Sequence, residues 1–394
     1  MSVKNILIIN SFSGGNTPLV NLLEELSGNG YYFYLISAGS GPVRQFQKNN
    51  WPVKKIYLGS ELNKKFNQIT FIFLLPFLFL MSLPRLAYYK VNKKINIAIC
   101  LNINEKIIFT PAAKLFGIKI IWLEDADSVL LNNKIVNVFL RLACKMCSRA
   151  ASVAAFNNFT KTKLKNFGIK EKNIKVIRPG VKLKKYEHQD NLFNELANVG
   201  GENYRRKFFT IGTVVELDKK QHIEILLQAI KICLNVIPNI QLIIVGEGAE
   251  RKNLAWLAKK MEIDGMVWFV GEQNHLKKWL DSFDVFAASS KLSGWGDFDI
   301  TLQAMAAELP VIGWKNAGLD ELAVAGGAPA PLDSFGVKCE NRRGAGVPRT
   351  TATDGETLAA QIIELYKNKN FRFKQGDENK KKVEKYFTID RMAE

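Results

Sequence analysis

The stretch that decides the fold runs from Asp284 to Leu322 and reads DVFAASSKLSGWGDFDITLQAMAAELPVIGWKNAGLDEL. It opens with a short apolar run, Val285 to Ala288, and continues through a Ser/Gly loop. From about Ile300 to Ala307 apolar residues recur at helical spacing, and an apolar run from Pro310 to Gly313 follows directly. The stretch therefore predicts a strand, a loop, a helix and a buried strand, which is the repeating unit of an α/β fold.

The start of this predicted helix favours an anion. The N–H groups of a first helical turn have no partner within the helix, and they lie at the positive end of the helix dipole. These N–H groups would face a ligand bound beside the loop from Ser293 to Asp299, and a phosphate group could accept their hydrogen bonds. We therefore expect Ile300 and Thr301, at the helix start, to belong to an anion site.

The same stretch resembles the signature of the retaining GT-B glycosyltransferases, in particular the large family 4 group (glycosyl transferases group 1). In that signature seven residues separate a first Glu from the Glu of a Leu-Glu-Ala-Met-Ala helix, which here reads Leu302-Gln303-Ala304-Met305-Ala306. Gln303 keeps the shape of the second Glu but not its charge. Trp295 stands at the place of the first Glu, while a shifted register offers Asp297 or Asp299.

The resemblance implies an α/β fold of the GT-B type, in which two Rossmann-like, doubly wound domains face each other across a cleft. A chain of 394 residues, 47% of them hydrophobic, can bury two such cores. We expect an acceptor-side domain at 1–181, a linker or excursion at 182–206, a nucleotide-sugar domain at 207–375 and a last helix at 376–394 that crosses back to the first domain. Glu308 stands where the family usually has the Gly of an Ala-x-Gly-x-Pro turn.

Charge and cysteine content limit the function classes. The formal net charge of +18 would attract nucleic acid, anionic lipid or phosphorylated substrates alike. No nucleic-acid-binding motif accompanies it, so we expect no nucleic-acid partner. The five cysteines form no disulfide framework and suit a reducing cytosol. Cys144 and Cys147 form a C-x-x-C pair inside an expected helix, Val136 to Ala151, with no second pair to complete a zinc site, so we expect no metal.

The N-terminus predicts a first βαβ unit and not a signal peptide. Its pattern indicates a strand at Asn5 to Asn10, a helix at Leu19 to Leu26 and a second strand at Tyr31 to Ser37. Between the first strand and the helix, Gly14-Gly15-Asn16 lets the backbone approach a ligand, because glycines add no side-chain bulk. Such a loop is as often a plain turn, but GT-B enzymes carry a similar one facing the cleft, so the resemblance implies donor binding here.

Ile69 to Leu83 is the most apolar piece of the chain, and basic residues follow it between Arg85 and Lys94. Its fifteen residues are fewer than the roughly twenty that span a bilayer, and Pro76 interrupts them. Two interpretations stay open: a helix packed on the N-terminal sheet, or a helix lying in the membrane interface and anchored by the basic residues. The second would add an anionic membrane surface as a partner of 69–94, and a cytoplasmic location peripheral on the inner membrane face.

Glu124 and Asp125 directly follow a predicted strand, Lys119 to Leu123. In open α/β sheets ligands bind outside the carboxyl ends of the strands, so Glu124 lies where a substrate would sit. It would contact sugar hydroxyls or a basic acceptor group. Alternatively, the two carboxylates cap the next helix. Many proteins of the family that this sequence resembles have a histidine near this point, and this chain has none there.

A second α/β series begins at Phe208. In the similar family segment a strand is followed by Arg or Glu, and then by a Lys-Gly pair at a helix start; here Glu216, Lys220 and Gln221 hold those places. The resemblance implies that Lys220 neutralises diphosphate oxygens, with Lys219 as the alternative if the loop is shifted. Without that context, either lysine is more simply a solvated surface charge.

Two glycine turns complete the family landmarks. A predicted strand at Ile240 to Val245 ends in Gly246-Glu247-Gly248, and one at Val267 to Val270 ends in Gly271-Glu272-Gln273. The resemblance implies that backbone groups here hold the nucleotide base. The implied donor-binding residues are Gly14, Gly15, Asn16, Lys219, Lys220, Gly246, Gly271, Glu272, Gln273, Ile300, Thr301 and Gln303, and the implied catalytic residues are Asp297, Lys220 and Glu124.

The sequence therefore predicts a retaining glycosyltransferase that moves a sugar from a UDP- or GDP-linked donor to a glycan or lipid-linked acceptor, in cell-surface polysaccharide or glycolipid synthesis. The nucleotide sugar is a co-substrate. No cofactor or metal is expected, because amides, a helix terminus and a lysine can stabilise the leaving group. A second hypothesis is a catalytically lapsed relative that binds a sugar nucleotide or a glycan and assists a partner, because Gln303 is uncharged and fold does not fix function.

Overall fold

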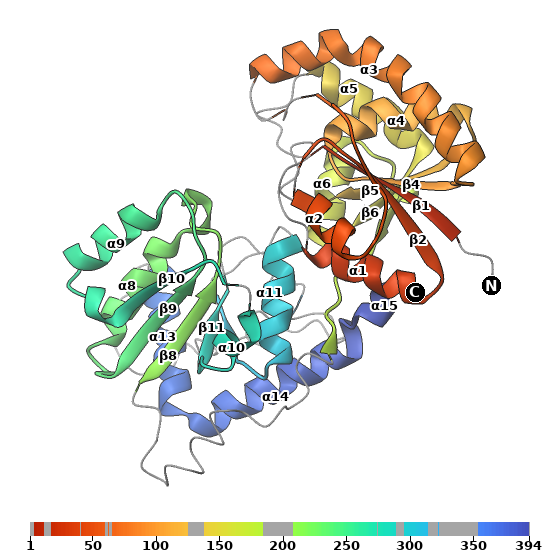
Figure 1. Cartoon of the computed structure of the whole chain (residues 1–394). Coiled ribbons are helices and arrows are strands. Elements are labelled where there is room, and N and C mark those ends of the chain that lie inside the picture. The colour runs from red at the N-terminus through yellow and green to blue at the C-terminus, as the bar shows by residue number, and fades with distance from the viewer. Residues whose placement is uncertain are drawn as a thin grey trace. The chain divides into compact units, whose positions relative to one another are not determined.

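The fold is seen in a computed structural model, which describes residues 4–11, 17–39, 41–59, 62, 65–124, 138–183, 208–273, 275–288, 295–313, 322 and 354–393. The chain divides into two compact units (Figure 1). Unit 1 comprises Met1–Pro179, Ser293–Gly296 and Ile389–Glu394, and unit 2 comprises Gly180–Leu292 and Asp297–Thr388.

Unit 1 is built on a parallel sheet whose described strands have the order β3-β2-β1-β4-β5-β6-β7. These strands are β1 (Lys4–Asn10), β2 (Tyr31–Ser37), β3 (Val53–Lys55), β4 (Ile97–Cys100), β5 (Lys119–Glu124), β6 (Ala151–Ala155) and β7 (Ile174–Val176). Alternate side chains of β1 enter different cores, Ile6 and Ile8 on one face and Leu7 and Ile9 on the other. Burial on both faces explains why the strands appear in the sequence as continuous apolar runs.

Helices cover both faces of this sheet (Figure 1). One face carries α3 (Lys65–Asn92), α4 (Ile103–Leu115), α5 (Val138–Cys147) and α6 (Asn158–Phe167). The other carries α1 (Thr17–Gly28), α2 (Gly41–Lys48) and the last helix, α15 (Ile389–Ala393). Asn157 caps α6 as its position predicts, because its side-chain oxygen accepts the Thr160 N–H at 2.7 Å.

Helix α3 is much longer than the sequence led us to expect. It continues through Pro76 and Pro84 over 28 residues, so the expected interruption at Pro76 is wrong. A proline removes one helical hydrogen bond, but packing along one side of a helix can hold the helix together across that gap. Within the described part of the chain, α3 is the one helix that is long and apolar enough to cross a membrane by length and composition.

Unit 2 holds a second parallel sheet, with the described strands in the order β10-β9-β8-β11-β12. The strands are β8 (Phe209–Val214), β9 (Ile240–Val245), β10 (Val267–Gly271), β11 (Val285–Ala287) and β12 (Val311–Ile312). One face packs against α8 (Ile223–Cys233), α9 (Arg251–Lys260) and α13 (Asp354–Lys367). The other packs against α10 (Leu276–Leu280), α11 (Trp295–Ala306) and α14 (Lys369–Tyr386).

Both sheets begin in the middle and then grow in opposite directions, so both are doubly wound, as predicted. The direction reverses between β1 and β4 in unit 1, and between β8 and β11 in unit 2. Ligands of such sheets bind outside the carboxyl ends of the strands at this switch point. The carboxyl ends of the strands at these two switch points are therefore the candidate ligand sites.

Candidate functional site

At the switch point of unit 2, the carboxyl end of β8 leads into a 3₁₀ turn, Lys219–Gln221, and then into α8. His222, the residue before α8, has a left-handed backbone with φ of 49°. A left-handed backbone favours glycine, and the family's glycine aligns with Gln221. In the structure this conformation occurs one residue later, at His222. Gln221 is 9% exposed, and its side-chain oxygen has no hydrogen-bond partner within the described part of the chain. A buried acceptor left without a partner is uncommon in folded proteins and is a signal for a missing ligand.

The structure describes the side chain of only one of the two lysines of this turn, Lys219. The backbone of Lys220 lies in the 3₁₀ turn just after β8, and its side chain lies outside the described part of the structure. Lys219 lines a pocket of about 400 Å³ together with Asp218, Glu224 and Glu250. Three carboxylates around one ammonium group repel a diphosphate. These carboxylates count against a phosphate role for Lys219, and the phosphate role of Lys220 stays a prediction.

The two glycine turns lie side by side at the carboxyl ends of β9 and β10. The N–H of Gly246 donates to the carbonyl of Gly271 at 2.9 Å, and their φ values are 135° and 77°. A Cβ added to Gly246 would lie 2.0 Å from the Val215 carbonyl oxygen, and one added to Gly248 would lie 2.3 Å from that of Leu217. Close backbone packing therefore requires these glycines, whether or not a ligand binds beside them.

The side chain of Gln273, just after β10, is held by the protein. Its amide nitrogen donates to the Val270 carbonyl at 3.0 Å, and the indole N–H of Trp279 donates to its amide oxygen at 3.3 Å. Glu272 is exposed. A base bound here would meet mainly backbone groups of this turn, and the base-binding role of Gly246, Gly271, Glu272 and Gln273 stays a prediction.

Helix α11 begins earlier than expected. It starts at Trp295 and not near Ile300, so Ile300 and Thr301 lie inside the helix, where the helical pattern pairs each N–H with a carbonyl four residues earlier. The amides left for an anion belong to the first turn, which contains Asp297. An acidic side chain in the first turn stabilises the positive end of the helix, which explains why the helix includes this polar segment.

Asp299 and Gln303 form a pair on α11. The Gln303 amide nitrogen donates to the Asp299 carboxylate at 2.6 Å, and Asp299 is 7% exposed. Their spacing of four residues places both on one side of the helix. Asp297 lies two positions before Asp299, about 200° around the helix axis, and so points elsewhere. Of the two carboxylates that a shifted register offered, the structure brings Asp299 to Gln303.

The switch point of unit 1 holds a buried polar network. The Asn102 side-chain amide donates to the Asn10 side-chain oxygen at 2.9 Å and joins the ends of β1 and β4. The Ser11 hydroxyl donates to one oxygen of Glu105 at 2.6 Å, and the Asn102 backbone N–H donates to the other at 2.6 Å. Burial raises the pKa of Glu105 above its ordinary value, while these hydrogen bonds act in the opposite direction.

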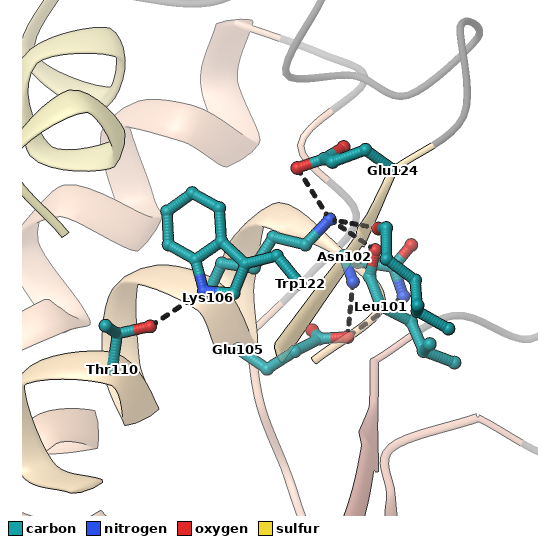
Figure 2. A network of polar contacts seen from close by, with 8 residues as sticks. Leu101, Asn102, Glu105, Lys106, Thr110, Trp122 and Glu124 are labelled. Carbon is teal, nitrogen blue, oxygen red and sulfur yellow. Dashed lines mark hydrogen bonds and ion pairs between the residues drawn. The ribbon is translucent and has the colours of Figure 1, made fainter. Parts of the chain in front are cut away.

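Lys106 and Glu124 form a buried ion pair in the same region (Figure 2). The Lys106 Nζ lies 2.9 Å from the Glu124 Oε1, and the two side chains are 1% and 0% exposed. The same ammonium donates to the carbonyls of Leu101 at 2.7 Å and Leu123 at 2.8 Å, the residues at the ends of β4 and β5. Apart from the ion pair, the Glu124 carboxylate has no hydrogen-bond partner among the residues that the structure describes. Much of its acceptor capacity is therefore unused by these residues, next to the carboxyl edge of the sheet.

Sequence reasoning found Glu124 and missed its neighbours. Asn10, Ser11, Asn102, Glu105 and Lys106 were not among the candidates. The spacing Asn102-x-x-Glu105 before an apolar run is a capping-box pattern, and it would have placed the start of α4 at Ile103 and Glu105 in its first turn.

Several candidates lie outside the described residues. These are the loop Gly14-Gly15-Asn16 and Asp125, so the capping alternative for that carboxylate is not described either. No cluster of three or more His, Cys, Asp or Glu that could hold a metal occurs in the ranges that the structure covers. Burial raises the pKa of Cys147 to about 11 and that of Cys144 well above its ordinary value, so their surroundings disfavour the thiolate form of both C-x-x-C cysteines.

Residues 200–382 match the family model described as Glycosyl transferases group 1. This segment is a glycosyl transferases group 1 domain. It contains the β8 end, both glycine turns and α11, so every candidate donor residue of unit 2 belongs to the group 1 domain.

Curated relatives resemble part of the chain. One is the GtfA subunit of the UDP-N-acetylglucosamine–peptide N-acetylglucosaminyltransferase of Streptococcus agalactiae, 29% identical over 167 residues, or 42% of this chain and 31% of that protein. Another is the N-acetyl-alpha-D-glucosaminyl L-malate synthase of Bacillus anthracis, 26% identical over 153 residues, or 39% of this chain and 35% of that protein. The chain thus spans about a third of the length of these relatives.

The fold is similar to that of HepE from Anabaena, solved in complex with UDP and glucose. The TM-score is 0.72 at 16% sequence identity, over 99% of this chain and 97% of that one. At this identity the likeness shows the fold alone. It confirms the prediction of a GT-B fold with two parallel-sheet α/β domains, the second of which carries the group 1 domain.

A larger pocket in the group 1 domain lies away from these residues. Its volume is about 460 Å³, and it lies next to Asp284 and Pro310, at the amino ends of β11 and β12. Ligands of doubly wound sheets bind at the carboxyl ends, so pocket volume does not mark the donor site here.

Proposed function

We propose that the chain is a glycosyltransferase that moves a sugar from a nucleotide-diphospho-sugar to a glycan or lipid-linked acceptor, in the synthesis of cell-surface polysaccharide or glycolipid. The observation that carries this proposal is the group 1 domain at 200–382, whose helix α11 carries the partly buried Asp299–Gln303 pair. The relative GtfA is named for UDP-N-acetylglucosamine, and HepE was solved with UDP, which supports a UDP-linked donor over a GDP-linked one.

In this proposal the donor binds unit 2. Lys220 and the first-turn amides of α11 stabilise the diphosphate, because an ammonium and a helix N-terminus both favour negative charge. Gln303 contacts the ribose hydroxyls, and Asp299 supplies the negative charge that Gln303 lacks. The turns at Gly246 and Gly271 hold the base, and the loop Gly14-Gly15-Asn16 of unit 1 adds backbone contacts to the phosphates.

The acceptor binds unit 1, where Glu124 accepts a hydrogen bond from an acceptor hydroxyl. In the transfer the acceptor oxygen forms a bond to the anomeric carbon, and the bond from that carbon to the phosphate oxygen breaks. Attack from the side of the leaving group retains the configuration, and the hydroxyl proton passes to the departing diphosphate. Lysine and amides stabilise the charge that develops there, so the step needs no metal, and Asp297 is the candidate to contact the transferred sugar.

We also propose a cytoplasmic location, peripheral on the inner membrane face. The cysteines that the structure describes, Cys100, Cys144, Cys147 and Cys233, are free thiols, which supports a reducing compartment.

The second candidate is a catalytically lapsed protein that binds a sugar nucleotide or a glycan and assists a partner. The observation that favours it is the hydrogen bond between Gln303 and Asp299, because it occupies part of the polar capacity of Gln303 before any ligand arrives. This candidate predicts donor binding without sugar transfer.

Thermal unfolding in the presence of UDP- and GDP-sugars, combined with a transfer assay, tests both candidates. A ligand that binds the native state raises the melting temperature, and at about 100 times Kd it stabilises by about 2.7 kcal/mol. We expect a shift with a UDP-sugar, and a loss of about tenfold or more in affinity for Asp299→Asn. Asp264→Asn, an exposed carboxylate on the same unit, is the control. The donor proposal fails if no sugar nucleotide shifts the transition.

A charge exchange between Asp299 and Gln303 sharpens this test. Gln303→Glu alone places two carboxylates at hydrogen-bond distance, and their repulsion should weaken donor binding. Asp299→Asn/Gln303→Glu restores one carboxylate and one amide with their places exchanged, so binding should recover. Transfer that is absent in the wild type and in the double variant, while both bind donor, would favour the lapsed protein.

A further inference from the structure

The exposed apolar side chains of unit 1 gather on one of its two helical layers. The described large hydrophobic side chains that are exposed in unit 1 lie on α3, on α5, at the end of α4 and at Tyr57. The layer on the opposite face of the sheet, formed by α1, α2 and α15, has none among its described side chains. Soluble surfaces scatter such residues singly, whereas a gathered patch marks an interaction site.

Helix α3 carries the longer part of this patch. Its exposed apolar side chains recur every three or four residues along one side of the helix, and they are Phe66, Ile69, Phe73, Phe77, Leu80, Met81, Tyr88 and Val91. Phe66 and Phe73 are 78% and 80% exposed. Phe71, Leu78 and Leu86 lie on the other side of α3 and are buried in the core. One side of the helix is thus fixed to the protein, and the other offers aromatic and aliphatic groups to the outside.

Helix α5 adds a second apolar stripe. Val138, Phe139, Leu142 and Met146 are exposed, with Val138 at 79%, while Leu140 and Cys144 between them are buried. Helices α3 and α5 both pack against α4, and Figure 1 shows all three on the same face of the sheet. The two stripes therefore belong to one helical layer and make one apolar face, which we call the α3–α5 face.

The charged residues within α3 and α5 have one sign. Neither α3 nor α5 contains an aspartate or a glutamate. Basic residues lie in these helices and directly after them, namely Arg85, Lys90, Lys93 and Lys94 for α3, and Arg141, Lys145 and Arg149 for α5. In the opposite layer, α1 carries Glu24 and Glu25. Two helices that offer apolar side chains and whose own charged residues are all cationic are complementary to a surface with an apolar interior and anionic headgroups.

The packing of α3 argues for a helix that lies on a membrane and does not cross it. The buried side of α3 covers α4, whose residues from Ile103 to Thr110 are buried. The Gln68 side chain is buried too, and it donates to the Leu62 carbonyl at 2.9 Å. A spanning α3 would have to leave this core and expose it to water.

We propose that unit 1 docks on an anionic lipid bilayer through the α3–α5 face, with both helices parallel to the surface and their basic residues at the phosphate headgroups. This inference deepens the peripheral location suggested above by naming the two helices that make the contact. Lipid binding requires no sugar donor, so it can be tested separately from the glycosyltransferase proposal.

Vesicle flotation of the full-length protein is the test. We expect flotation with vesicles of phosphatidylcholine containing about 30% phosphatidylglycerol at about 0.1 M salt, and less with phosphatidylcholine alone or at about 0.5 M salt. Phe73→Ser/Phe77→Ser should lower the partition coefficient about tenfold or more, and Phe139→Ser/Leu142→Ser should also lower it. These side chains are exposed, so the variants should keep the wild-type circular dichroism spectrum.

Matched variants on unit 2 distinguish binding through the α3–α5 face from non-specific binding of the protein to vesicles. Trp256→Ser/Trp268→Ser removes two exposed aromatic side chains elsewhere and should leave flotation unchanged. For the charges, Lys94→Glu/Arg149→Glu should weaken binding at low salt, and Lys252→Glu/Lys259→Glu, on exposed positions of α9, should weaken it less.

Three outcomes would overturn the proposal. They are no flotation with anionic vesicles, flotation that the Phe73/Phe77 pair does not change, and self-association by light scattering that this pair abolishes in a protein that binds no vesicles. The last result would make the face a contact between two copies of the chain. A protein that floats but transfers no sugar would support docking and count against the proposed function alone.

Discussion

The two sheets are wound in the same way around their switch points, but their carboxyl edges are built in different ways. In unit 1 the edge is held by side chains, with Lys106 joining the ends of β4 and β5 and Glu105 joining Ser11 to Asn102. In unit 2 it is held by backbone, with Gly246 paired to Gly271 and packed against the Val215 carbonyl. The carboxyl edge of unit 1 is therefore rich in buried charged side chains, whereas the glycine turns at the carboxyl edge of unit 2 consist mainly of backbone groups.

This difference decides what each edge can do. A backbone edge offers N–H and C=O groups at fixed positions, which suits a flat base and a diphosphate. A side-chain edge with a buried carboxylate suits a hydroxyl, because a carboxylate with unused acceptor capacity gains from a donor. The comparison therefore predicts that unit 2 tolerates changes of side chain better than changes of glycine, and that unit 1 behaves the other way round.

The largest effect is expected at Gly246. In Gly246→Ala the new Cβ would meet the Val215 carbonyl oxygen at 2.0 Å, and the backbone would keep a φ of 135° that side chains disfavour. Both are backbone conflicts that a rotamer change cannot relieve, so we expect a loss of about 5 kcal/mol or more in the free energy of unfolding. Urea unfolding measures it. Gly265→Ala, where an added Cβ meets nothing within 4 Å, is the control, and equal losses in both variants would contradict the argument.

The next effect concerns the ion pair of unit 1. Lys106→Met leaves the Glu124 carboxylate buried without a partner, and such a change typically costs about 3–5 kcal/mol. Lys106→Met/Glu124→Leu removes both charges and should recover about 2 kcal/mol of that loss, with the carbonyls of Leu101 and Leu123 still lacking a donor. A double-mutant cycle from urea unfolding gives the coupling, and additive losses would show that the two side chains do not act together.

A smaller, pH-dependent effect is expected at Ser11. Its hydroxyl donates to the ionised Glu105, so Ser11→Ala should cost about 1–2 kcal/mol at neutral pH. This hydrogen bond lowers the pKa of Glu105 against the raising effect of burial, so its loss raises that pKa further. The variant then gains stability relative to the wild type as the pH falls through the raised pKa, and the deficit should shrink as the pH is lowered from neutral toward 4.5, the ordinary pKa of a glutamate.

Ser148→Ala is the control for this pH dependence. Its hydroxyl is buried and donates to the Lys145 carbonyl at 2.9 Å, with no carboxylate involved, so its cost should stay constant over the same range. A Ser11→Ala deficit that is equally constant would show that Glu105 does not change its protonation there.

The sequence predicts the carboxyl edge of unit 2 better than that of unit 1, because the first depends on backbone requirements and the second on contacts between distant side chains. The strand order and the glycine turns of unit 2 are readable, because buried strands are continuous apolar runs and glycines mark a backbone requirement at one position. The Asp299–Gln303 pair is readable in principle, since four residues make one helical turn. The unit 1 network is not, because Ser11 and Glu105 are 94 residues apart and meet only once β1 and β4 are neighbours.

Two local predictions of secondary structure were wrong. In both, packing or electrostatics around a residue outweighed its average preference against helix. Pro76 does not end α3, because buried side chains on either side of it, such as Phe71 and Leu78, fix the helix to the core. Gly296 and Asp297 read as loop, but they form the first turn of α11, where an acidic residue is favourable.

The smallest effect tests a turn of unit 2 at which Glu308 stands in place of the family's glycine. Glu308 has a left-handed backbone with φ of 59°, as the family's Gly at this turn suggests, and its carboxylate lies 2.6 Å from the Lys380 ammonium. Glu308→Gly removes about 1 kcal/mol of backbone strain and a partly exposed ion pair worth less than about 1 kcal/mol, so we expect a net gain of at most about 0.5 kcal/mol. Glu262→Gly, with the same φ of 59° and a looser pair to Lys231 at 3.9 Å, should gain more. If Glu308→Gly instead destabilises by more than about 1 kcal/mol, the ion pair outweighs the strain, and unit 2 depends on side chains at this turn as unit 1 does at its edge.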